Sequence, residues 1–376
     1  MKDSNMRTFV FAGGGTGGHI YPGLAVADEL RKIAESKNQK IKIVWIGNSS
    51  GMDRNIVEKS GSADLFYGVP SGKLRRYFSF KNFLDVFKIF FGFAKSFLFL
   101  LKTKPDVLFS KGGFVSVPPC VAAHLLHIPV FTHECDFTPG LATRINSKFA
   151  SKILVSYDET KKYFSPEKQN RIIVTGNPVR PVFYSADKKE GRKFLFENRP
   201  DYDPSKPILL VLGGSLGAHQ INSLVAQNLD WLVSHFNVVH QCGGRDFKEM
   251  PENVSGYFLY SFIYAQMPDV IACADAVLSR AGANSLWECS VLEKAMVLIP
   301  LCGGGSRGDQ IDNAKYFAER GAAQILVGDD ADSEKLKKSL EKLLDENERK
   351  KIARNAGALS AGKRPARRIA EIVYDI

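Results

Sequence analysis

Apolar runs followed by glycine-rich loops are the first regular pattern in this chain. An apolar run from Thr8 to Ala12 leads into GGGTGGH (Gly13–His19), and apolar residues at helical spacing follow. A second apolar run covers 41–47. The same order returns about two hundred residues later, with PILLVLGG (207–214), SLGAHQ and a helical pattern over 221–236. This repetition predicts an α/β protein with two similar domains, each a parallel sheet covered by helices.

Further apolar runs predict more strands, and nearly all lack polar alternation, which is typical of strands buried on both faces. They cover 105–110, 128–133, 152–156, 171–176, 275–280 and 295–301. A stretch rich in Lys, Glu, Asp and Pro, 180–207, predicts the connection between the domains. We therefore expect an N-terminal domain over 1–180 and a C-terminal domain over 181–357. The basic, helical tail is expected to end in a helix, 358–376, that packs back on the first domain.

Composition narrows the class of protein. The 376 residues are 44% hydrophobic and 24% charged, which excludes disorder, collagen and coiled coil. The formal charge of +11 implies an acidic partner, which could be nucleic acid, an anionic membrane or a phosphorylated substrate. The six cysteines form no CxxC pair, so neither a zinc site nor a disulfide framework is predicted. A reducing cytoplasm fits this usage, and the first apolar run is too short for a signal peptide.

The first glycine loop fits several nucleotide-binding patterns only in part. Gly13, Gly15 and Gly18 match GxGxxG between a strand and a helix, where backbone amides can hold a phosphate. A dinucleotide site also needs an acidic residue at the end of the second strand, and WIGNSSG (45–51) has none. Neither glycine loop carries the lysine of a Walker loop. An NAD enzyme and a P-loop nucleotidase are therefore both disfavoured.

Four loops follow predicted buried strands: GGGTGGH, KGGFVS (111–116), GGSLGA (213–218) and SRAGANS (279–285). Ligands of open parallel sheets bind beyond the carboxyl ends of the strands. Two such domains are expected to enclose a cleft suited to a nucleoside diphosphate joined to another group. The alternative is that these glycines only let helices pack closely on strands.

Six segments, in order along most of the chain, resemble one known family. They are GGGTGGHIYPGLAVADEL, GGFVSVPPCVAAHLLHIPVFTHECDFTPGLATRINSKFA, GNPVR, GGSLGAHQIN, SRAGANSLWECSVLEKAMVLIPL and SRGDQIDNA. The family is that of the bacterial N-acetylglucosaminyltransferases that convert lipid I to lipid II in peptidoglycan synthesis. The resemblance implies the GT-B fold, with two Rossmann-like domains. It also implies UDP-GlcNAc as donor, undecaprenyl-diphospho-muramoyl-pentapeptide as acceptor, and inversion at the transferred sugar.

The resemblance assigns catalysis to His19 and Glu134. Transfer to an alcohol needs a base, and the positive end of a helix is expected to keep the His19 imidazole neutral, the form that a base requires. The alternative is that His19 only orders the turn. The acceptor diphosphate is expected on Gly14, Gly15, Thr16, Gly112 and Gly113.

On the donor side the resemblance implies ten residues, some with a simpler alternative. Ser215 would bind a donor phosphate or only cap a helix, and Glu288 would bind the ribose or only complete a capping box with Ser285. Arg180 would lie near the nucleotide or form a surface ion pair. Ile263 would bind uracil through its backbone. Asp309 and Gln310 would bind the sugar hydroxyls or only form a solvated loop. The full set is Thr16, Gly17, Gly18, Asp136, Arg180, Ser215, Ile263, Glu288, Asp309 and Gln310. HECD (133–136) departs from the family's HEQN, and Asp136 can accept from a sugar hydroxyl but cannot donate.

A stretch rich in Phe and Leu, interspersed with Lys and Arg, covers 73–104. Its apolar part holds Asp85, Lys88 and Lys95, which would be costly inside a bilayer, so we expect a helix that lies in the membrane interface. Some of its phenylalanines are expected to fill the core instead. The residues expected to meet an anionic membrane are Arg75, Arg76, Phe78, Phe83, Phe87, Lys88 and Phe91.

The sequence thus predicts a peripheral enzyme at the cytoplasmic face of the plasma membrane, working on UDP-GlcNAc and lipid I without a cofactor or metal and without nucleic acid. Two alternatives stay open. Another GT-B transferase or a UDP-GlcNAc epimerase would share the donor cleft but would not need the Phe-rich basic stretch. A basic nucleic-acid-binding protein would have no affinity for a diphospho-sugar, and the chain has no recognised motif of that class.

Overall fold

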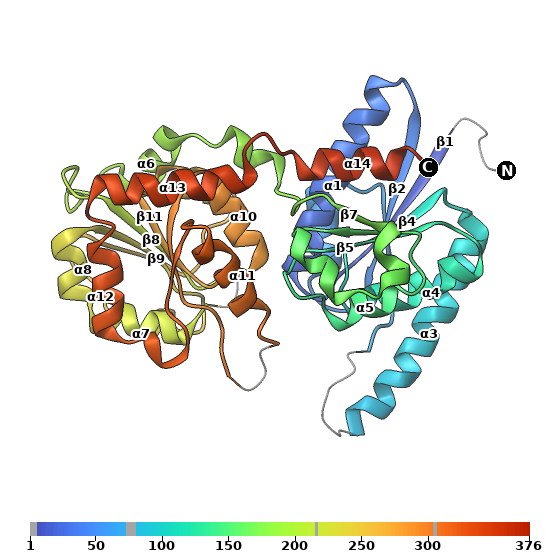
Figure 1. Cartoon of the computed structure of the whole chain (residues 1–376), viewed down its shortest axis with the longest axis horizontal. Coiled ribbons are helices and arrows are strands. Elements are labelled where there is room, and N and C mark those ends of the chain that lie inside the picture. Colours follow the sequence, from blue (N-terminus) through green and yellow to red (C-terminus); the bar gives the residue numbers. More distant parts are fainter. Residues whose placement is uncertain (1–5, 73–79, 215–216, 304–306) are drawn as a thin grey trace. The chain divides into compact units, whose positions relative to one another are not determined.

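The chain folds into two compact units (Figure 1). The computed structural model describes residues 6–72, 80–214, 217–303 and 307–376, with the backbone alone for 80–84. Unit 1 comprises Met1–Arg180 and Arg364–Ile376, and unit 2 comprises Pro181–Lys363. The chain thus returns to its first unit at Arg364.

Unit 1 is built on a seven-stranded parallel sheet. The central strands β1 and β2 carry apolar runs that are buried, as expected where helices cover both faces. In spatial order the strands are β3 (Leu65–Val69), β2 (Lys40–Asn48), β1 (Met6–Ala12), β4 (Val107–Ser110), β5 (Val130–Glu134), β6 (Lys152–Val155) and β7 (Ile172–Val174).

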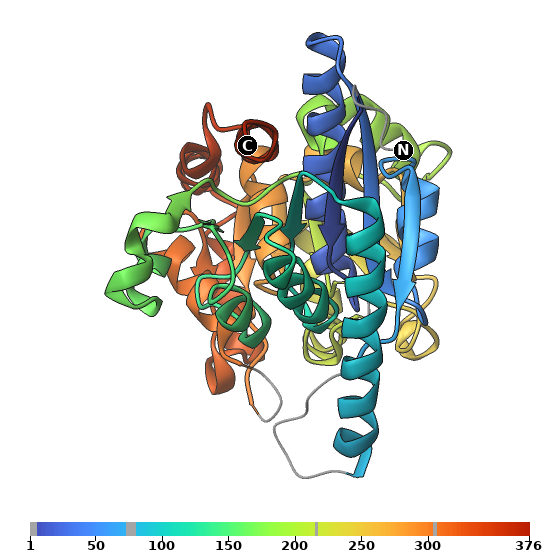
Figure 2. The ribbon, with the colours of Figure 1, turned by 90° about the vertical axis from the view of Figure 1, so that its right-hand side faces the viewer.

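Helices cover both faces of this sheet. Alternate residues of β1 divide between two cores: Phe9 and Phe11 pack with one set of helices, Val10 and Ala12 with the other. The helices of the first core are α1 (Gly17–Ser36), α2 (Asp53–Ser60) and α14 (Pro365–Tyr374). Those of the second core are α3 (Phe80–Thr103) and α4 (Val117–Leu125), and α5 (Leu141–Asn146) packs against α4. Figure 2 shows α3 as a long cyan helix whose first turns extend beyond the rest of unit 1.

The C-terminal helix α14 is an integral part of unit 1. It packs along α1, and Ile369 and Val373 are fully buried in the core of β1 and β2. Tyr374 stacks on Phe9 with ring centroids 6.2 Å apart, and the Arg7 guanidinium lies 4.6 Å from the centre of the Tyr374 ring. The last helix therefore buries an apolar face that α1 leaves open.

Unit 2 repeats the architecture with a six-stranded parallel sheet. One face packs on α7 (His219–Gln227), α8 (Leu229–His235) and α12 (Ser333–Glu341). On the other face, Phe196 of α6 (Lys188–Phe196) contacts Phe258 of β10 (Tyr257–Tyr260) edge to face. Its strands, in spatial order, are β10 (Tyr257–Tyr260), β9 (Asn237–Gln241), β8 (Ile208–Leu212), β11 (Ala276–Ser279), β12 (Ala295–Leu298) and β13 (Gln324–Ile325). Its helices are α6 (Lys188–Phe196), α7 (His219–Gln227), α8 (Leu229–His235), α9 (Met267–Cys273), α10 (Ala283–Val291), α11 (Asp309–Glu319), α12 (Ser333–Glu341) and α13 (Glu346–Ser360).

The predicted fold class, two parallel-sheet α/β domains, is confirmed. Four strands were not predicted, β3, β9, β10 and β13, because they are short and β9 carries the polar residues His240 and Gln241, both buried. The single helix predicted over 221–236 is wrong. It is broken at Asn228, whose side chain turns back to donate to the Leu224 carbonyl at 2.7 Å.

Within the part of the chain that the structure describes, no helix is both long and apolar enough to span a bilayer. The longest, α3, carries its polar residues along its whole length, among them Asp85, Lys88 and Lys95.

Replacement of Ile369 by Ala is expected to destabilise unit 1 by about 2–5 kcal/mol, because it leaves a cavity in a fully buried contact between α14 and the sheet. Trp45 lies in this core, so urea unfolding followed by its fluorescence, with Trp231 and Trp287 replaced by Phe, reports on unit 1. The matched control is Ile376→Ala, since Ile376 is 48% exposed and should change stability by less than about 0.5 kcal/mol. Equal effects of the two changes would contradict the docking of α14.

Candidate active site

The first glycine loop joins β1 to α1 and is held by hydrogen bonds to the Asp53 carboxylate. The Asp53 carboxylate accepts the backbone N–H of Gly15 at 3.0 Å and that of Asn48 at 2.8 Å. Gly14 has no room for a side chain, because a Cβ atom there would lie 1.8 Å from Asp53 Oδ2. The Gly15 amide, one of those expected to face a phosphate, is thus already engaged by the protein.

Sequence reasoning did not single out Asp53. It is the first residue of α2 and only 1% exposed, and burial raises the pKa of its carboxyl group although the N–H groups of Asn48 and Gly15 oppose this. An Asp in the first turn of a helix is common, so its sequence position alone did not distinguish it from an ordinary helix-start residue.

His19 lies in the first turn of α1, where the two glycine loops of unit 1 meet. Its Nδ1 atom lies 3.3 Å from the carbonyl oxygen of Lys111, and because a carbonyl only accepts, Nδ1 is the donor; in a neutral imidazole the lone pair then lies on Nε2. Gly113 lies against the ring, since a Cβ there would come within 3.0 Å of His19 Cδ2. The KGGFVS loop therefore sets both the tautomer and the orientation of the imidazole.

Glu134 ends β5 and is 5% exposed. Its Oε1 accepts the N–H of Asp136 at 3.1 Å and its Oε2 accepts the N–H of Gly140 at 2.9 Å, just before α5. Both oxygens are thus engaged in ordering the loop. The half-buried Asp136 lies in the same loop.

The remaining predicted residues of unit 1 lie near the start of α1. Thr16 and Gly18 are exposed and Gly17 is half-buried, and the Thr16 side chain makes no capping hydrogen bond to the helix. The Arg180 guanidinium lies 5.0 Å from the centre of the Tyr21 ring, one turn into α1. This is a cation–π contact, and it packs the Arg180 side chain against the start of α1.

Unit 2 has a hollow of about 470 Å³ at the carboxyl ends of β8 and β11. Glycines of the GGSLGA loop form part of its wall, and Gly214 and Gly217 adopt φ values of +82° and +80° that suit glycine. It is lined by Leu212, Gly213, Gly214, Gly217, Ala218, His219, Gln220, Arg245, Ser279, Arg280, Gly282, Ser285, Leu301 and Gln310. Arg245, Arg280 and the N-terminus of α7 make it suited to an anion.

Asp246 organises one wall of this hollow. Its carboxylate accepts from Asn222 Nδ2 at 2.8 Å, Arg245 Nε at 3.1 Å and His219 Nδ1 at 3.3 Å. Burial acts to raise its pKa, but the hydrogen bonds from Asn222, Arg245 and His219 outweigh this and hold the pKa below the usual range. Glu249 lies nearby, and one ligand atom each of His219, Asp246 and Glu249 fall within 4.8 Å of one another. Other side chains donate hydrogen bonds to both Asp246 oxygens, so the Asp246 carboxylate positions Arg245 and His219.

Glu288 lies in the second turn of α10, which begins at Ala283 after Gly282. The capping-box alternative is therefore wrong, because it requires Glu288 in the first turn. Ser285 lines the hollow, and Glu288, three residues later, lies on the same face of the helix.

Asp309 and Gln310 form the first turn of α11, so the solvated-loop alternative is wrong. Gln310 lines the hollow and its Oε1 accepts the N–H of Leu301 at 3.0 Å, while Asp309 pairs with Arg307 at 2.9 Å.

Ile263 is 3% exposed, and its N–H donates to Gln241 Oε1 at 2.8 Å. Sequence reasoning did not predict this role for Gln241, which follows from its position at the end of β9.

Five predicted residues cannot be placed. Ser215, Arg75, Arg76 and Phe78 lie outside the described residues, as does the side chain of Phe83.

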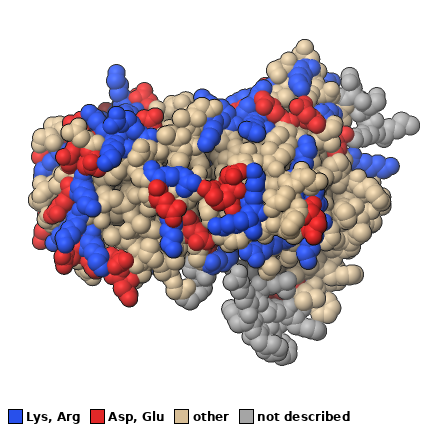
Figure 3. Space-filling view, in the orientation of Figure 1, with Lys and Arg blue, Asp and Glu red and all other residues tan. Residues whose placement is uncertain are grey.

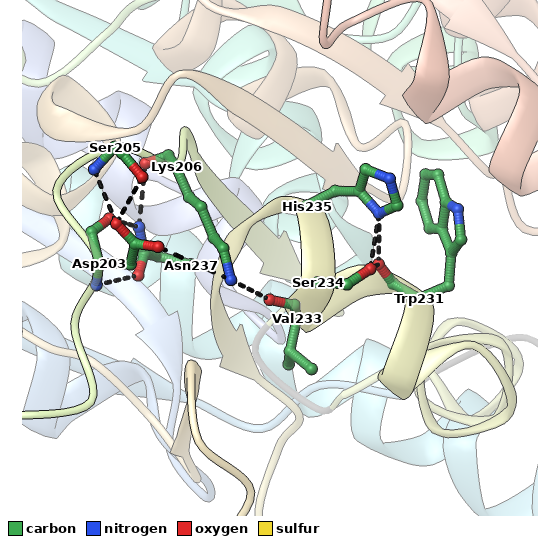
Figure 4. A network of polar contacts seen from close by, with 8 residues as sticks. All are labelled: Asp203, Ser205, Lys206, Trp231, Val233, Ser234, His235 and Asn237. Carbon is green, nitrogen blue, oxygen red and sulfur yellow. Dashed lines mark hydrogen bonds and ion pairs between the residues drawn. The ribbon is translucent and has the colours of Figure 1, made fainter.

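A second hollow, of about 320 Å³, lies at the opposite, amino-terminal end of β8 and β9. Asn237 is fully buried there and its amide donates to the carbonyl groups of Asp203 and Lys206, as drawn in Figure 4. Lys206 in turn donates to the Val233 carbonyl at 2.9 Å. These polar groups satisfy one another, which indicates a structural network.

Comparison with known proteins agrees with this arrangement. The glycosyltransferase family 28 N-terminal domain matches residues 9–155 and the glycosyltransferase family 28 C-terminal domain matches 208–371. A UDP-N-acetylglucosamine–N-acetylmuramyl-(pentapeptide) pyrophosphoryl-undecaprenol N-acetylglucosamine transferase from Treponema denticola is 50% identical, over 98% of this chain and 97% of its own. A protein of the same name, numbered 2, from Bacillus cereus is 41% identical, over 93% of this chain and 94% of its own.

Solved structures share the fold. MurG from Acinetobacter baumannii superimposes with a TM-score of 0.73 at 22% identity, covering 99% of this chain and 100% of its own. A UDP-GlcNAc 2-epimerase from Neisseria meningitidis, bound to UDP-GlcNAc, superimposes with a TM-score of 0.68 at 14% identity, covering 98% of this chain and 99% of its own. Since both matches fall below 25% identity, they speak for the fold alone. The sequence matches decide the family: this chain belongs to glycosyltransferase family 28, among the N-acetylglucosamine transferases of peptidoglycan synthesis.

Proposed function

We propose that this chain transfers N-acetylglucosamine from UDP-GlcNAc to the muramoyl 4-hydroxyl of undecaprenyl-diphospho-MurNAc-pentapeptide, with inversion at the sugar, to form lipid II. The observation that carries the proposal is the 50% identity, over 98% of the chain, to a transferase named for this reaction. The two glycine loops around His19 and the anion-suited hollow of unit 2 supply groups for both substrates.

The hollow of unit 2 is the proposed donor site. Arg245, Arg280 and the start of α7 would neutralise the diphosphate as UDP departs, which is the charge that develops in the transition state. Arg280 is held in place by the Ile299 carbonyl at 3.0 Å and by Gln220 at 2.9 Å, so its guanidinium is preorganised. Glu288 would accept the ribose hydroxyls and Gln310 would contact the sugar.

His19 is the proposed base. Its Nδ1–H donates to the Lys111 carbonyl, which puts the lone pair on Nε2, the atom that would accept the proton of the acceptor hydroxyl. Gly112 and Gly113 lie beside the ring, and the Thr16 carbonyl accepts the backbone N–H of His19 at 3.1 Å; these three residues would face the acceptor diphosphate. Glu134 would act by ordering the loop that carries Asp136.

The alternatives make different predictions. An epimerase shares the fold but would transfer no GlcNAc to a lipid acceptor. A nucleic-acid-binding protein would need a continuous basic surface, whereas acidic and basic side chains are interspersed on the face drawn in Figure 3.

The proposed site of action is the cytoplasmic face of the plasma membrane, with α3 as the peripheral attachment. Leu100 and Ser96 are buried against unit 1, but the opposite face of α3 exposes large apolar residues. They are Val86 (54%), Phe87 (49%), Phe90 (62%), Phe91 (59%), Leu98 (65%) and Leu101 (48%). Lys88 lies among them and could meet anionic headgroups, although it is also 3.3 Å from Asp85.

His19→Ala is expected to lower kcat about 100- to 10,000-fold, because it removes the general base, with the Kd of UDP-GlcNAc nearly unchanged. The assay follows labelled GlcNAc onto a lipid I analogue with UDP release in parallel. The control is His124→Ala, an exposed histidine on α4. Loss of donor affinity in His19→Ala would instead place His19 at the donor site.

Glu288→Gln is expected to weaken UDP-GlcNAc binding about 10- to 150-fold, because a carboxylate that accepts two hydroxyl groups is lost while the side chain keeps its size. Isothermal titration calorimetry measures the affinity. Glu341→Gln, at an exposed position of α12, is the matched control. An unchanged Kd would remove Glu288 from the donor site.

Joint replacement of Phe87, Phe90 and Phe91 by Ser is expected to lower binding to vesicles of anionic phospholipid at least about tenfold, since three exposed rings no longer enter the interface. Transfer to a short-chain soluble acceptor should be retained. Leu125→Ser, which removes another exposed apolar residue of unit 1, is the control in vesicle flotation. Equal binding by all three proteins would contradict attachment through α3.

A further inference from the structure

Lys111 is a buried lysine with an unusual neighbour. It follows β4 at the carboxyl edge of the unit 1 sheet and is 2% exposed. Its Nζ atom lies 2.6 Å from Sγ of Cys135, which follows the adjacent strand β5. Within the described part of the chain, no carboxylate lies within ion-pairing distance of this amine. The carboxylate of Glu134, next to Cys135, is engaged by two backbone N–H groups instead.

A buried amine that faces sulfur is not explained by packing alone. Burial of an ammonium group is costly unless it is paired, and a thiol is a weak acceptor. The Cys135 thiol donates to Asn177 Oδ1 at 2.8 Å, which directs sulfur lone pairs toward Lys111. On the other side, the His133 imidazole is held by the Gly176 carbonyl at 3.0 Å. The two reactive atoms are thus held in contact by their neighbours.

We propose that Lys111 and Cys135 form an oxidative modification site, at which a hydroperoxide joins Lys111 Nζ and Cys135 Sγ through one oxygen atom. The sulfur attacks one molecule of hydrogen peroxide, the O–O bond breaks, and a sulfenic acid and water result. A second molecule of peroxide oxidises the amine to a hydroxylamine and is itself reduced to water. Condensation of the two groups forms the S–O–N bridge and releases a third water. Thiol and amine each lose two electrons, and each peroxide gains two.

The geometry favours this bridge over other oxidation products. A separation of 2.6 Å between nitrogen and sulfur is close to the span of two single bonds that meet at one oxygen, so the backbone need not move. Cys135 is buried, with 8% exposed, which favours a small oxidant such as hydrogen peroxide over a bulky thiol such as glutathione. Burial raises the pKa of the Cys135 thiol to about 11, although the neighbouring Lys111 opposes this.

The position of the bridge connects it to the active site. The carbonyl of the same Lys111 holds His19, and Gly112 and Gly113 follow directly. The crosslink would tie this segment to the loop ordered by Glu134. The chemistry itself does not depend on the proposed transferase activity, so the two can fail separately.

The test uses the full chain, purified under reduction and then exposed to hydrogen peroxide. The expected result is a gain of about 14 Da per chain, one oxygen added and two hydrogens lost, that dithiothreitol reverses. Trypsin should then yield one peptide, 103–144, because it can no longer cleave after Lys111. Chymotrypsin cleaves after Phe114 and Phe131, so fragments with Lys111 and Cys135 should stay joined only through the bridge.

Two variants and one internal control make the result specific. Cys135→Ser and Lys111→Met should each abolish the gain of mass. Lys294 is also buried, but its amine donates to the carbonyl groups of Ala272 and Ala274, so it should stay free of crosslinks to the nearby Cys273. Addition of about 16 or 32 Da to Cys135 with normal cleavage after Lys111 would overturn the proposal. So would loss of two hydrogens alone, which indicates a direct S–N bond, or absence of any change at Cys135.

Discussion

Parallel pairing of β1 with β4 is the constraint on which the candidate active site depends. The register places Ala12 opposite Ser110, and the Lys111 N–H donates to the Ala12 carbonyl at 2.8 Å. The loops that follow these strands therefore begin side by side, although about a hundred residues separate them in the sequence. His19 can reach the Lys111 carbonyl only because of this pairing. Orientation of the proposed base is thus a consequence of sheet topology.

The same constraint acts in unit 2. Parallel pairing of β8 with β9 and β11 gathers the loops after all three strands at one edge. Arg245 and Arg280 come from two of these loops, and the start of α7 follows the third. Each unit thus concentrates its polar chemistry beyond the carboxyl ends of its central strands, and the amino-terminal end of β8 and β9 carries a self-satisfied network instead.

The sequence predicted these edges well because a glycine loop directly after an apolar run is typical of the carboxyl end of a buried parallel strand. The loops that carry His19 and the glycines near Lys111 were predicted from such motifs, whereas Gln310 was predicted from the resemblance to a known family. It could not predict Asp53 or Gln241, because each acts through a backbone N–H that is distant in the chain and near only after folding. It also misplaced the start of α10, since Ser285 and Glu288 have capping-box spacing although the helix begins earlier, at Ala283. Local patterns identify elements, but partners across loops follow from tertiary packing.

The anomeric configuration of the product tests the account most directly. With His19 as the proposed base, transfer proceeds by a single displacement, which inverts the configuration at the anomeric carbon. UDP-GlcNAc carries an α linkage, so NMR of the disaccharide formed on a lipid I analogue should show a β-linked GlcNAc. An α-linked product would contradict single displacement with His19 as base, and release of an epimerised sugar with no disaccharide would contradict transfer altogether.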